Sequence, residues 1–235
     1  MTRADMADIL RKLDLCSEEE RREVFTHLRK RYPIHDLEQK WNAPAEIILE
    51  AIARSQDITH RGIRGVIAEL CFFLYVVENL KKSGWEDKTP GGDLPYDCLL
   101  SDLTGEVKVQ VKLQRQVKGA PLTSYQWRKN LPKTWFVVET QKTRTGKDAA
   151  GEDTRPYRFG EFDILAVSMH PSTRDWKRFM YAVGGWLLPR KKDSGLINVF
   201  QPVSGEPNED WTDNFLTAVG WFREGRQKTI HPGKL

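Results

Sequence analysis

The sequence predicts an α/β (α+β) fold in which helices flank a central mixed β-sheet. Apolar residues recur at helical spacing between residues 17 and 80, and at strand spacing after residue 96. A helical pattern returns near the C-terminus, from Asn214 to Arg223. Helices followed by a cluster of strands and a final helix are typical of a sheet packed by helices.

The composition is that of a globular protein in an aqueous compartment. Of its 235 residues, 30% are charged and 39% are hydrophobic, and the net charge of +4 permits an anionic partner without demanding one. The longest apolar run, residues 70–77, is shorter than the ~20 residues that span a bilayer. The opening residues carry acids and no apolar run, which excludes a signal peptide. We therefore expect a cytoplasmic protein with no membrane segment.

Three helices are predicted in the first third of the chain. Ser17-Glu18-Glu19-Glu20 is a capping box that opens a helix ending at about Arg31. A second helix begins near Pro44, and a third runs from Thr59 to about Leu80. The third carries a broad apolar stripe, which predicts burial against a sheet. The stripe comprises Ile63, Val66, Ile67, Leu70, Phe73, Leu74 and Val77.

These helices suggest that the chain has two regions. Residues 1–58 are interpreted as a helical N-terminal region packed on a core, and residues 59–235 as that core with a C-terminal extension. The length fits one compact domain overall.

A β-hairpin is predicted after the third helix. Two strand-like segments, Tyr96–Leu100 and Val107–Leu113, flank residues 102–105, which have turn chemistry. Valines alternate with polar residues in the second segment, which predicts a core face and an opposite polar face. Further strands are expected at residues 135–139, 162–169 and 197–200.

The turn at residues 102–105 fixes the register of this hairpin. Facing residues then place Asp97 opposite Gln110, with Cβ atoms ~5 Å apart. Lys112 lies two residues beyond Gln110 and shares its face. Mg²⁺ prefers oxygen ligands, so the Asp97 carboxylate, the Gln110 side-chain carbonyl and the main-chain carbonyl of Val111 form a suitable cradle. Lys112 could orient an attacking water and offset charge on a phosphate.

Other acids compete for a place in this site. Glu106-Val107-Lys108 also fits a Glu-x-Lys pattern, but the register places Glu106 opposite Ser101, roughly 13 Å from Asp97. Gln110 and Lys112 are therefore favoured, with Glu106 as the fallback. Glu69 lies inside the apolar third helix, where a carboxylate must be paired, exposed at an edge or bound to metal. Asp93, four residues before Asp97, is a weaker candidate.

The order of these residues resembles a known family. Glu69 in a helix, then Pro95-Tyr96-Asp97, a short turn and Val109-Gln110-Val111-Lys112 resemble the PD-(D/E)XK nuclease superfamily, in the variant where Gln replaces the middle acid. The resemblance covers roughly residues 59–118. It implies a restriction-endonuclease-like core that hydrolyses DNA phosphodiester bonds with Mg²⁺, or Mn²⁺ as a substitute, and leaves 5′-phosphates. Asp97 and Gln110 would be metal ligands, Glu69 an auxiliary ligand and Lys112 the group that positions water.

The size of the chain and its lack of helicase or methyltransferase motifs resemble type II restriction endonucleases. That resemblance implies a homodimer that cuts double-stranded DNA at a palindromic or nearly palindromic site and works beside a DNA methyltransferase. Two alternatives stay open. One is a recombination or repair nuclease resembling junction resolvases, and the other is a non-catalytic DNA-binding protein with a decayed nuclease fold, of which Gln110 would be the mark.

Basic residues are available to contact DNA phosphates after two of the predicted strands. Solvated loop charge is the alternative interpretation of each. The candidates are Arg115, Lys118, Lys142, Arg144, Lys147, Arg155 and Arg158.

Overall fold

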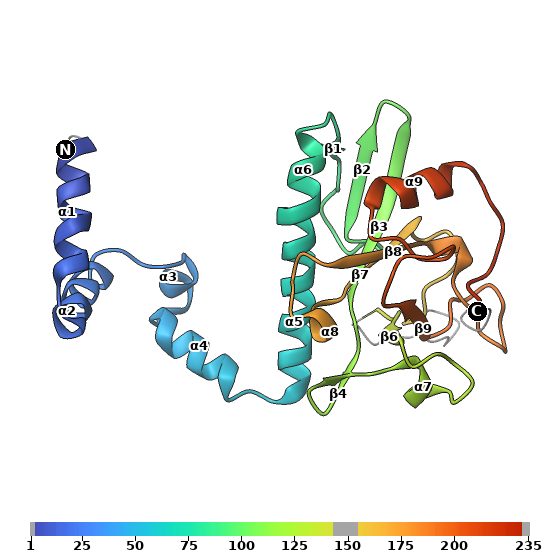
Figure 1. The fold of residues 1–235 in the computed structure, drawn as a ribbon, viewed down its shortest axis with the longest axis horizontal. Coiled ribbons are helices and arrows are strands. Elements are labelled where there is room, and N and C mark those ends of the chain that lie inside the picture. The colour runs from blue at the N-terminus through green and yellow to red at the C-terminus, as the bar shows by residue number, and fades with distance from the viewer. Residues whose placement is uncertain (1–2, 143–154, 232–235) are drawn as a thin grey trace. The chain divides into compact units, whose positions relative to one another are not determined.

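The computed structural model describes residues 3–142 and 155–231. The chain divides into two compact units, Met1–Arg61 and Gly62–Leu235. Figure 1 shows the elements of both along the chain. Within the described residues, no helix is long and apolar enough to cross a membrane.

The first unit is helical. It contains α1 (Arg3–Leu15), α2 (Glu18–Arg29), α3 (Leu37–Trp41) and α4 (Ala45–Ala53). The predicted capping box is present, because the Ser17 hydroxyl accepts the Glu20 N–H and the Glu20 carboxylate accepts the Ser17 N–H at 2.7 Å. Helix α1 was not predicted. None of these four helices has a buried residue.

A long helical run leads into the second unit. Helix α5 (Asp57–Phe72) continues through a π-helical segment, η1 (Phe73–Val77), into α6 (Glu78–Lys81). The predicted helix exists, but its apolar stripe is not largely buried as expected, since Val66, Leu70 and Leu74 are exposed.

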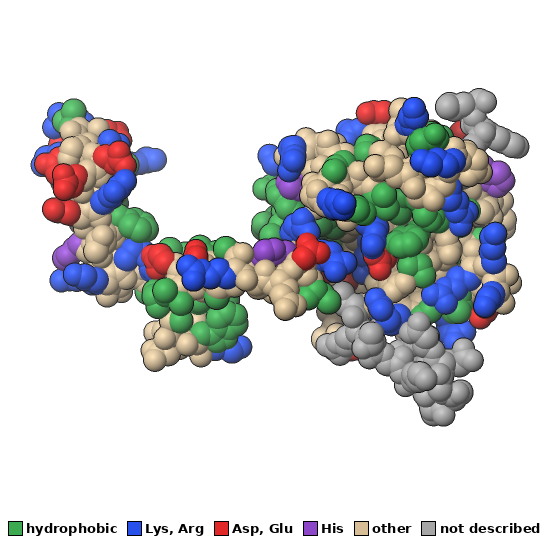
Figure 2. All heavy atoms as spheres, turned by 90° about the horizontal axis from the view of Figure 1, so that it is seen from below, with side chains coloured by type: hydrophobic (Ala, Val, Ile, Leu, Met, Phe, Trp, Pro, Cys, Tyr) green, Lys and Arg blue, Asp and Glu red, His purple; other side chains and the backbone are tan. Residues whose placement is uncertain are grey.

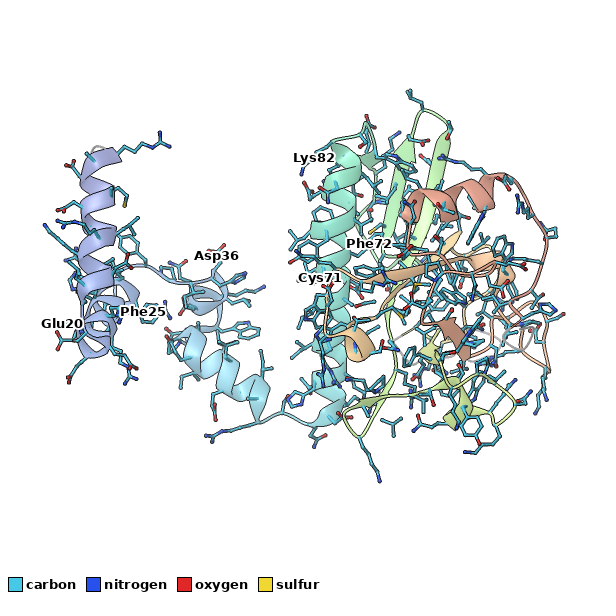
Figure 3. All side chains as sticks on the ribbon, viewed as in Figure 1. Glu20, Phe25, Asp36, Cys71, Phe72 and Lys82 are labelled. Atoms are coloured by element: carbon cyan, nitrogen blue, oxygen red, sulfur yellow. The ribbon has the colours of Figure 1, made fainter. Side chains whose placement is uncertain are left out.

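The π-helical segment explains which residues of this run are buried instead. Ala68, Phe72, Val77 and Leu80 form the buried line. Phe72 and Val77 are five residues apart, which is the spacing of one π-helical turn, so this turn shifts the buried face by one residue. Phe72 is labelled in Figure 3 on the side of the helix that faces the strands. A sequence pattern read at a period of 3.6 residues does not detect this shift.

The central sheet has five strands in the order β1-β2-β3-β7-β8. Strands β3 and β7 are parallel, and every other neighbouring pair is antiparallel. This confirms the predicted mixed sheet flanked by helices. The strands are β1 (Glu86–Asp87), β2 (Cys98–Asp102), β3 (Gly105–Leu113), β7 (Ile164–Ser168) and β8 (Phe179–Val183).

Two smaller sheets lie outside the central one. Strand β6 (Trp135–Glu139) falls where a strand was predicted, but it forms its ladder with β9 (Phe200–Ser204) and not within the central sheet. Isolated bridges also join Phe136 to Thr123 and Val138 to Gln114. That last strand begins where the prediction of residues 197–200 ends. Strands β4 (Gln116–Val117) and β5 (Ala120–Pro121) form a short hairpin. The remaining elements are α7 (Ser124–Trp127), α8 (His170–Thr173), the 3₁₀ turn η2 (Gly184–Trp186) and α9 (Phe215–Arg223).

One face of the central sheet packs on α5 and α9. Phe72 of α5 contacts Phe179 of β8 with ring centroids 5.6 Å apart and Phe215 of α9 at 6.0 Å. Phe179 shares its face with Val109 and Val111, because directly paired residues project from the same side of a sheet. The valines of β3 therefore lie on the helix-packed face. Gln110 and Lys112 project from the opposite face.

Candidate active site

Strand β3 extends beyond its partner β2. The hairpin register is the predicted one, with Cys98 paired to Val109. The backbone N–H of Asp97 still donates to the Val109 carbonyl at 2.9 Å, but the ladder stops there. The Asp97 carboxylate then accepts the Val111 N–H at 2.7 Å. A side chain thus supplies the acceptor that another strand residue would have offered, as a buried backbone N–H requires.

Gln110 completes this contact across the hairpin. Its side chain is 2% exposed, and its Nε2 donates both to the Asp97 carboxylate and to the Val111 carbonyl, the latter at 3.2 Å. The predicted proximity of Asp97 and Gln110 is therefore correct. The amide nitrogen, rather than the oxygen, faces the carboxylate. Gln110 would need a half-turn of its amide to offer oxygen to a cation beside Asp97.

Two cavities meet at this open edge of β3. A cavity of about 410 Å³ lies on the polar face and a second of about 400 Å³ lies on the face toward α5. Both are lined by Glu69, Asp93, Leu94 and Asp97. Glu69 therefore reaches this edge of β3 from the helix side, where β2 has ended. The weaker candidate, Asp93, lies at the same junction.

The polar cavity has an excess of acids. Its charged lining consists of Glu69, Asp93, Asp97 and Glu161 against Lys112 and Lys142. Four carboxylates facing two ammonium groups leave a net charge of −2 when all are ionised. Such a cavity favours a divalent cation, because a positive ion offsets the repulsion between carboxylates.

The pKa of Glu69 reflects this crowding. Burial, followed by the nearby Asp97 carboxylate, raises the Glu69 pKa from its usual 4.5 to about 7, and Lys112 opposes the rise. Burial also raises the pKa of Asp97, against the lowering effects of Lys112, the Val111 N–H and Gln110. The three charged groups therefore lie close enough to control one another's protonation.

Lys112 is a half-buried cation of the site. Burial lowers the pKa of its ammonium, while Asp97 and Glu69 act in the opposite direction. Its Nζ lies 5.4 Å from the centre of the Tyr157 ring. An ammonium in such surroundings is stabilised by the acids and the aromatic face together.

Sequence reasoning missed two residues of the cavity, Tyr157 and Glu161. The Lys142 ammonium also lies 5.4 Å from the Tyr157 ring centre, so this ring contacts both lysines. The Glu161 carboxylate pairs with Lys142 at 2.8 Å and accepts the Arg158 N–H at 2.9 Å. Both residues precede β7, and the parallel pairing of β7 with β3 is the signal that would have placed them beside Gln110.

The other predicted site residues lie in varied surroundings. Glu106 faces Ser101 as the register predicts, is exposed and lines neither cavity. Arg115 pairs with Glu139, and its guanidinium lies 5.0 Å from the Phe200 ring centre. Lys118 occupies a left-handed position in the exposed β4–β5 turn.

The remaining basic candidates are distributed around the second unit. Arg158 is exposed and Arg155 is half-buried, whereas Arg144 and Lys147 lie outside the described residues. Of the five basic candidates that lie within the described residues, Lys142 is the one that lines the cavity with Lys112. Figure 2 shows Lys and Arg side chains spread over the face of the second unit that it presents.

A metal ion at this site would depend on few protein ligands. In the part of the chain that the structure describes, no group of three or more His, Cys, Asp or Glu side chains could hold a metal ion. Two carboxylates, Asp97 and Glu69, line both cavities, whereas Gln110 lines the polar cavity and Val111 the one toward α5. This oxygen-rich and incomplete set suits Mg²⁺, which retains several of its waters when bound.

Comparison with solved structures shows a weak likeness to an endonuclease. No family model matches the chain, and no curated protein matches it. Among solved structures, it is similar to the bacterial homing endonuclease I-Ssp6803I with 20% sequence identity and a TM-score of 0.35. The match covers 70% of this chain and 94% of that one. This likeness is too weak to indicate a function for the chain.

Proposed function

We propose that the chain is a Mg²⁺-dependent endodeoxyribonuclease of the PD-(D/E)XK type. The proposal depends on one observation. Asp97, Gln110 and Lys112 line a single cavity with Glu69, at the edge where β3 extends beyond β2. An acid fixed by the strand that bears the lysine, with a second acid from a helix, is a suitable arrangement for hydrolysing a phosphodiester bond.

Each residue of the site would have a separate role in the reaction. Asp97 and Glu69 would hold the cation, with the Val111 carbonyl and, after its amide turns, the Gln110 oxygen. When bound, Mg²⁺ supplies Lewis acidity and lowers the pKa of a coordinated water. Lys112 would orient the attacking water and stabilise negative charge on the phosphate as the P–O3′ bond breaks. The products are a 5′-phosphate and a 3′-hydroxyl.

More specifically, we propose that this nuclease is a cytoplasmic type II restriction endonuclease. It would act on double-stranded DNA as a homodimer, so that two sites cut the two strands, and it would be paired with a DNA methyltransferase that protects the host. Lys142 would contact the substrate beside Lys112, because both lysines line the same cavity.

A plasmid digest tests this proposal. Wild-type protein should cut plasmid DNA into discrete fragments with Mg²⁺ or Mn²⁺, and should not cut in EDTA. Sequencing the fragment ends would show the site and the 5′-phosphates. Asp97→Asn should lose cleavage by at least about 10²-fold while DNA binding stays measurable. Retained cleavage by Asp97→Asn would refute this nuclease site.

One observation favours a second candidate, a DNA-binding protein that has lost catalysis. The Gln110 amide donates a hydrogen bond to Asp97 and so stabilises the carboxylate without any cation. No nicking of plasmid in either metal, with duplex binding intact, would support this alternative. Cleavage confined to branched substrates would instead favour a junction-resolving nuclease.

A further inference from the structure

Tyr157 is a buried tyrosine in the wall of the polar cavity. It is 3% exposed, and its ring packs edge-on against the Phe162 ring with centroids 5.3 Å apart. The backbone carbonyl of Tyr157 accepts the Ile197 N–H at 2.8 Å. Packing of the ring and this backbone hydrogen bond fix the side chain, so the fold determines the position of the phenol.

The segment that carries Tyr157 also places Lys142 beside its ring. Gln141 and Pro156 form an isolated antiparallel bridge, and the Lys142 N–H donates to the Arg155 carbonyl at 2.9 Å. Lys112 belongs to β3, and both lysine ammonium groups lie 5.4 Å from the centre of the tyrosine ring. Because an aromatic face attracts cations, this ring holds two ammonium groups at one wall of the cavity.

The Tyr157 hydroxyl lies near the acids of the same cavity. Burial raises the pKa of the phenol, and four carboxylates raise it further. They are Asp97, Glu161, Glu69 and Asp93, which are the four that line the cavity. A phenol with a pKa above its usual value of about 10 keeps its proton at neutral pH. The hydroxyl is therefore a constant hydrogen-bond donor inside an ionic cavity.

No group in the described part of the chain accepts the proton of the Tyr157 hydroxyl. The neighbouring acids have other partners, since Asp97 accepts the Gln110 amide. Glu161 accepts the Lys142 ammonium at 2.8 Å. A buried donor without a partner is uncommon in native proteins, and a role in ligand binding is one explanation of such a group. The cavity of about 410 Å³ is many times the ~30 Å³ that one water molecule occupies, so it has room for a larger ligand.

We propose that Tyr157 binds the substrate by donating its hydroxyl proton to a phosphate oxygen of DNA that lies between Lys112 and Lys142. This inference rests on the proposed function, because it names a contact of DNA in the same cavity. The two ammonium groups attract the phosphate, and the phenol adds a neutral donor in a fixed position. Tyrosine hydroxyls are among the groups that contact DNA phosphates, and such contacts position the backbone without reading the bases.

Removal of the phenolic oxygen tests this contact. Tyr157→Phe keeps the ring that both lysines contact and deletes the donor. Affinity for a labelled duplex should fall about ten-fold, because a hydrogen bond to a charged phosphate is lost. The slope of log affinity against log salt should stay at the wild-type value, because a neutral phenol releases no counterion. Fluorescence anisotropy from about 50 to 200 mM salt, with Ca²⁺ present to occupy the acids, measures both quantities.

Thermal unfolding separates this role from a structural one. Tyr157→Phe should unfold at the wild-type temperature, because the hydroxyl makes no hydrogen bond within the described residues. Tyr181→Phe is the matched control, since Tyr181 is also 3% exposed and lines neither cavity. The Tyr181 ring packs against Phe72, Phe179 and Phe215. This control should keep both the affinity and the salt slope of wild type.

The other outcomes identify which inference is wrong. If wild type binds the duplex and Tyr157→Phe binds it equally well, the contact is refuted and the nuclease proposal stands. A smaller salt slope in the variant would show that the lysines have moved, and a lower unfolding temperature would show that the hydroxyl bonds within the protein. Either result overturns the inference.

Cleavage is measured separately so that the two proposals can fail independently. Duplex binding that depends on the Tyr157 hydroxyl, in a wild-type protein that does not cut plasmid in Mg²⁺ or Mn²⁺, would refute the nuclease and leave this contact standing. A wild-type protein that binds no duplex would overturn both.

Discussion

The Asp97 carboxylate accepts the backbone N–H of Val111 at 2.7 Å and so takes the place of the next rung of the β2–β3 ladder. The proposed catalytic acid is therefore also part of the sheet edge. Its position depends on the strand that carries Gln110 and Lys112, which fixes the acid and the lysine relative to each other.

This double role predicts that two substitutions of Asp97 differ in stability. Asp97→Ala leaves the Val111 N–H without an acceptor and should lower the free energy of unfolding by about 1–3 kcal/mol. Asp97→Asn keeps a side-chain oxygen at the same place, so its free energy of unfolding should fall much less. Both variants should lose cleavage. Urea denaturation at pH 7 measures the difference. Equal stability of the two variants would show that the carboxylate does not replace the ladder bond.

Gln110→Glu should make stability depend on metal. Without metal, a second carboxylate would face Asp97 in place of the amide that now donates to it, and the variant should unfold several degrees below wild type. Millimolar Mg²⁺ should reverse this loss, because two acids at the edge bind a cation more tightly than one acid and one amide. Thermal unfolding in EDTA and in Mg²⁺ compares the two states.

A matched control is available for this change. Gln126 occupies the third position of the α7 capping box, where Glu serves as well as Gln. Gln126→Glu should unfold like wild type in both buffers. If Mg²⁺ leaves Gln110→Glu unchanged relative to this control, the edge of β3 is not a cation site.

Much of the hairpin could be predicted because local chemistry determines it. The turn at Asp102–Gly105 sets the register, and the alternation of valines sets the faces, so the pairing of Ser101 with Glu106 followed from the sequence. Strand β8 could not be found in this way, since all five of its residues are buried and show no alternation. The burial of α5 was mistaken because a π-helical turn changes the period inside the run.

Glu69 should make the metal-free fold less stable as pH rises. Its pKa is about 7 in the folded chain and near 4.5 ordinarily, so the folded state binds the proton more tightly. Stability from this group is present at pH 4.5 and is lost as pH rises toward 7. Glu69→Gln removes this pH dependence. The free energy of unfolding of the variant should exceed that of wild type by on the order of 1 kcal/mol at pH 8 but not at pH 5.

Chemical denaturation in EDTA at pH 5, 6, 7 and 8 measures this difference. Glu106→Gln removes a carboxylate that lines neither cavity and serves as the control. Adding Mg²⁺ at pH 8 should narrow the difference between wild type and Glu69→Gln, because the cation stabilises the ionised acid. A difference that does not change with pH would show that Glu69 is not held protonated by its surroundings.

The candidate site was predictable where it follows one hairpin and not where it depends on distant segments. Asp97, Gln110 and Lys112 are joined by a turn of four residues, and Glu69 could be suspected because an acid interrupts an apolar helix. Tyr157 reaches the site only because β7 runs parallel to β3, a long-range pairing that no local pattern encodes.

Lys142 should contribute to DNA binding and Glu161 should oppose it. Lys142 lines the cavity, and its ammonium is held by the Glu161 carboxylate at 2.8 Å. Lys142→Ala should weaken duplex binding several-fold and reduce the slope of log affinity against log salt by about 1, the effect of losing one phosphate contact. Glu161→Gln removes a negative charge and releases the ammonium, so it should tighten binding.

Fluorescence anisotropy with a labelled duplex, from 50 to 200 mM salt, measures these effects in the range where phosphate contacts dominate. Lys129→Ala is the control, since Lys129 is an exposed lysine that lies over the Tyr125 ring and lines neither cavity. Its variant should change neither the affinity nor the salt slope. Lys142→Ala could behave like this control, and Glu161→Gln could also leave the affinity unchanged. In that case the DNA phosphates do not bind at the Tyr157 side of the cavity, and Lys142 is not a DNA-binding residue.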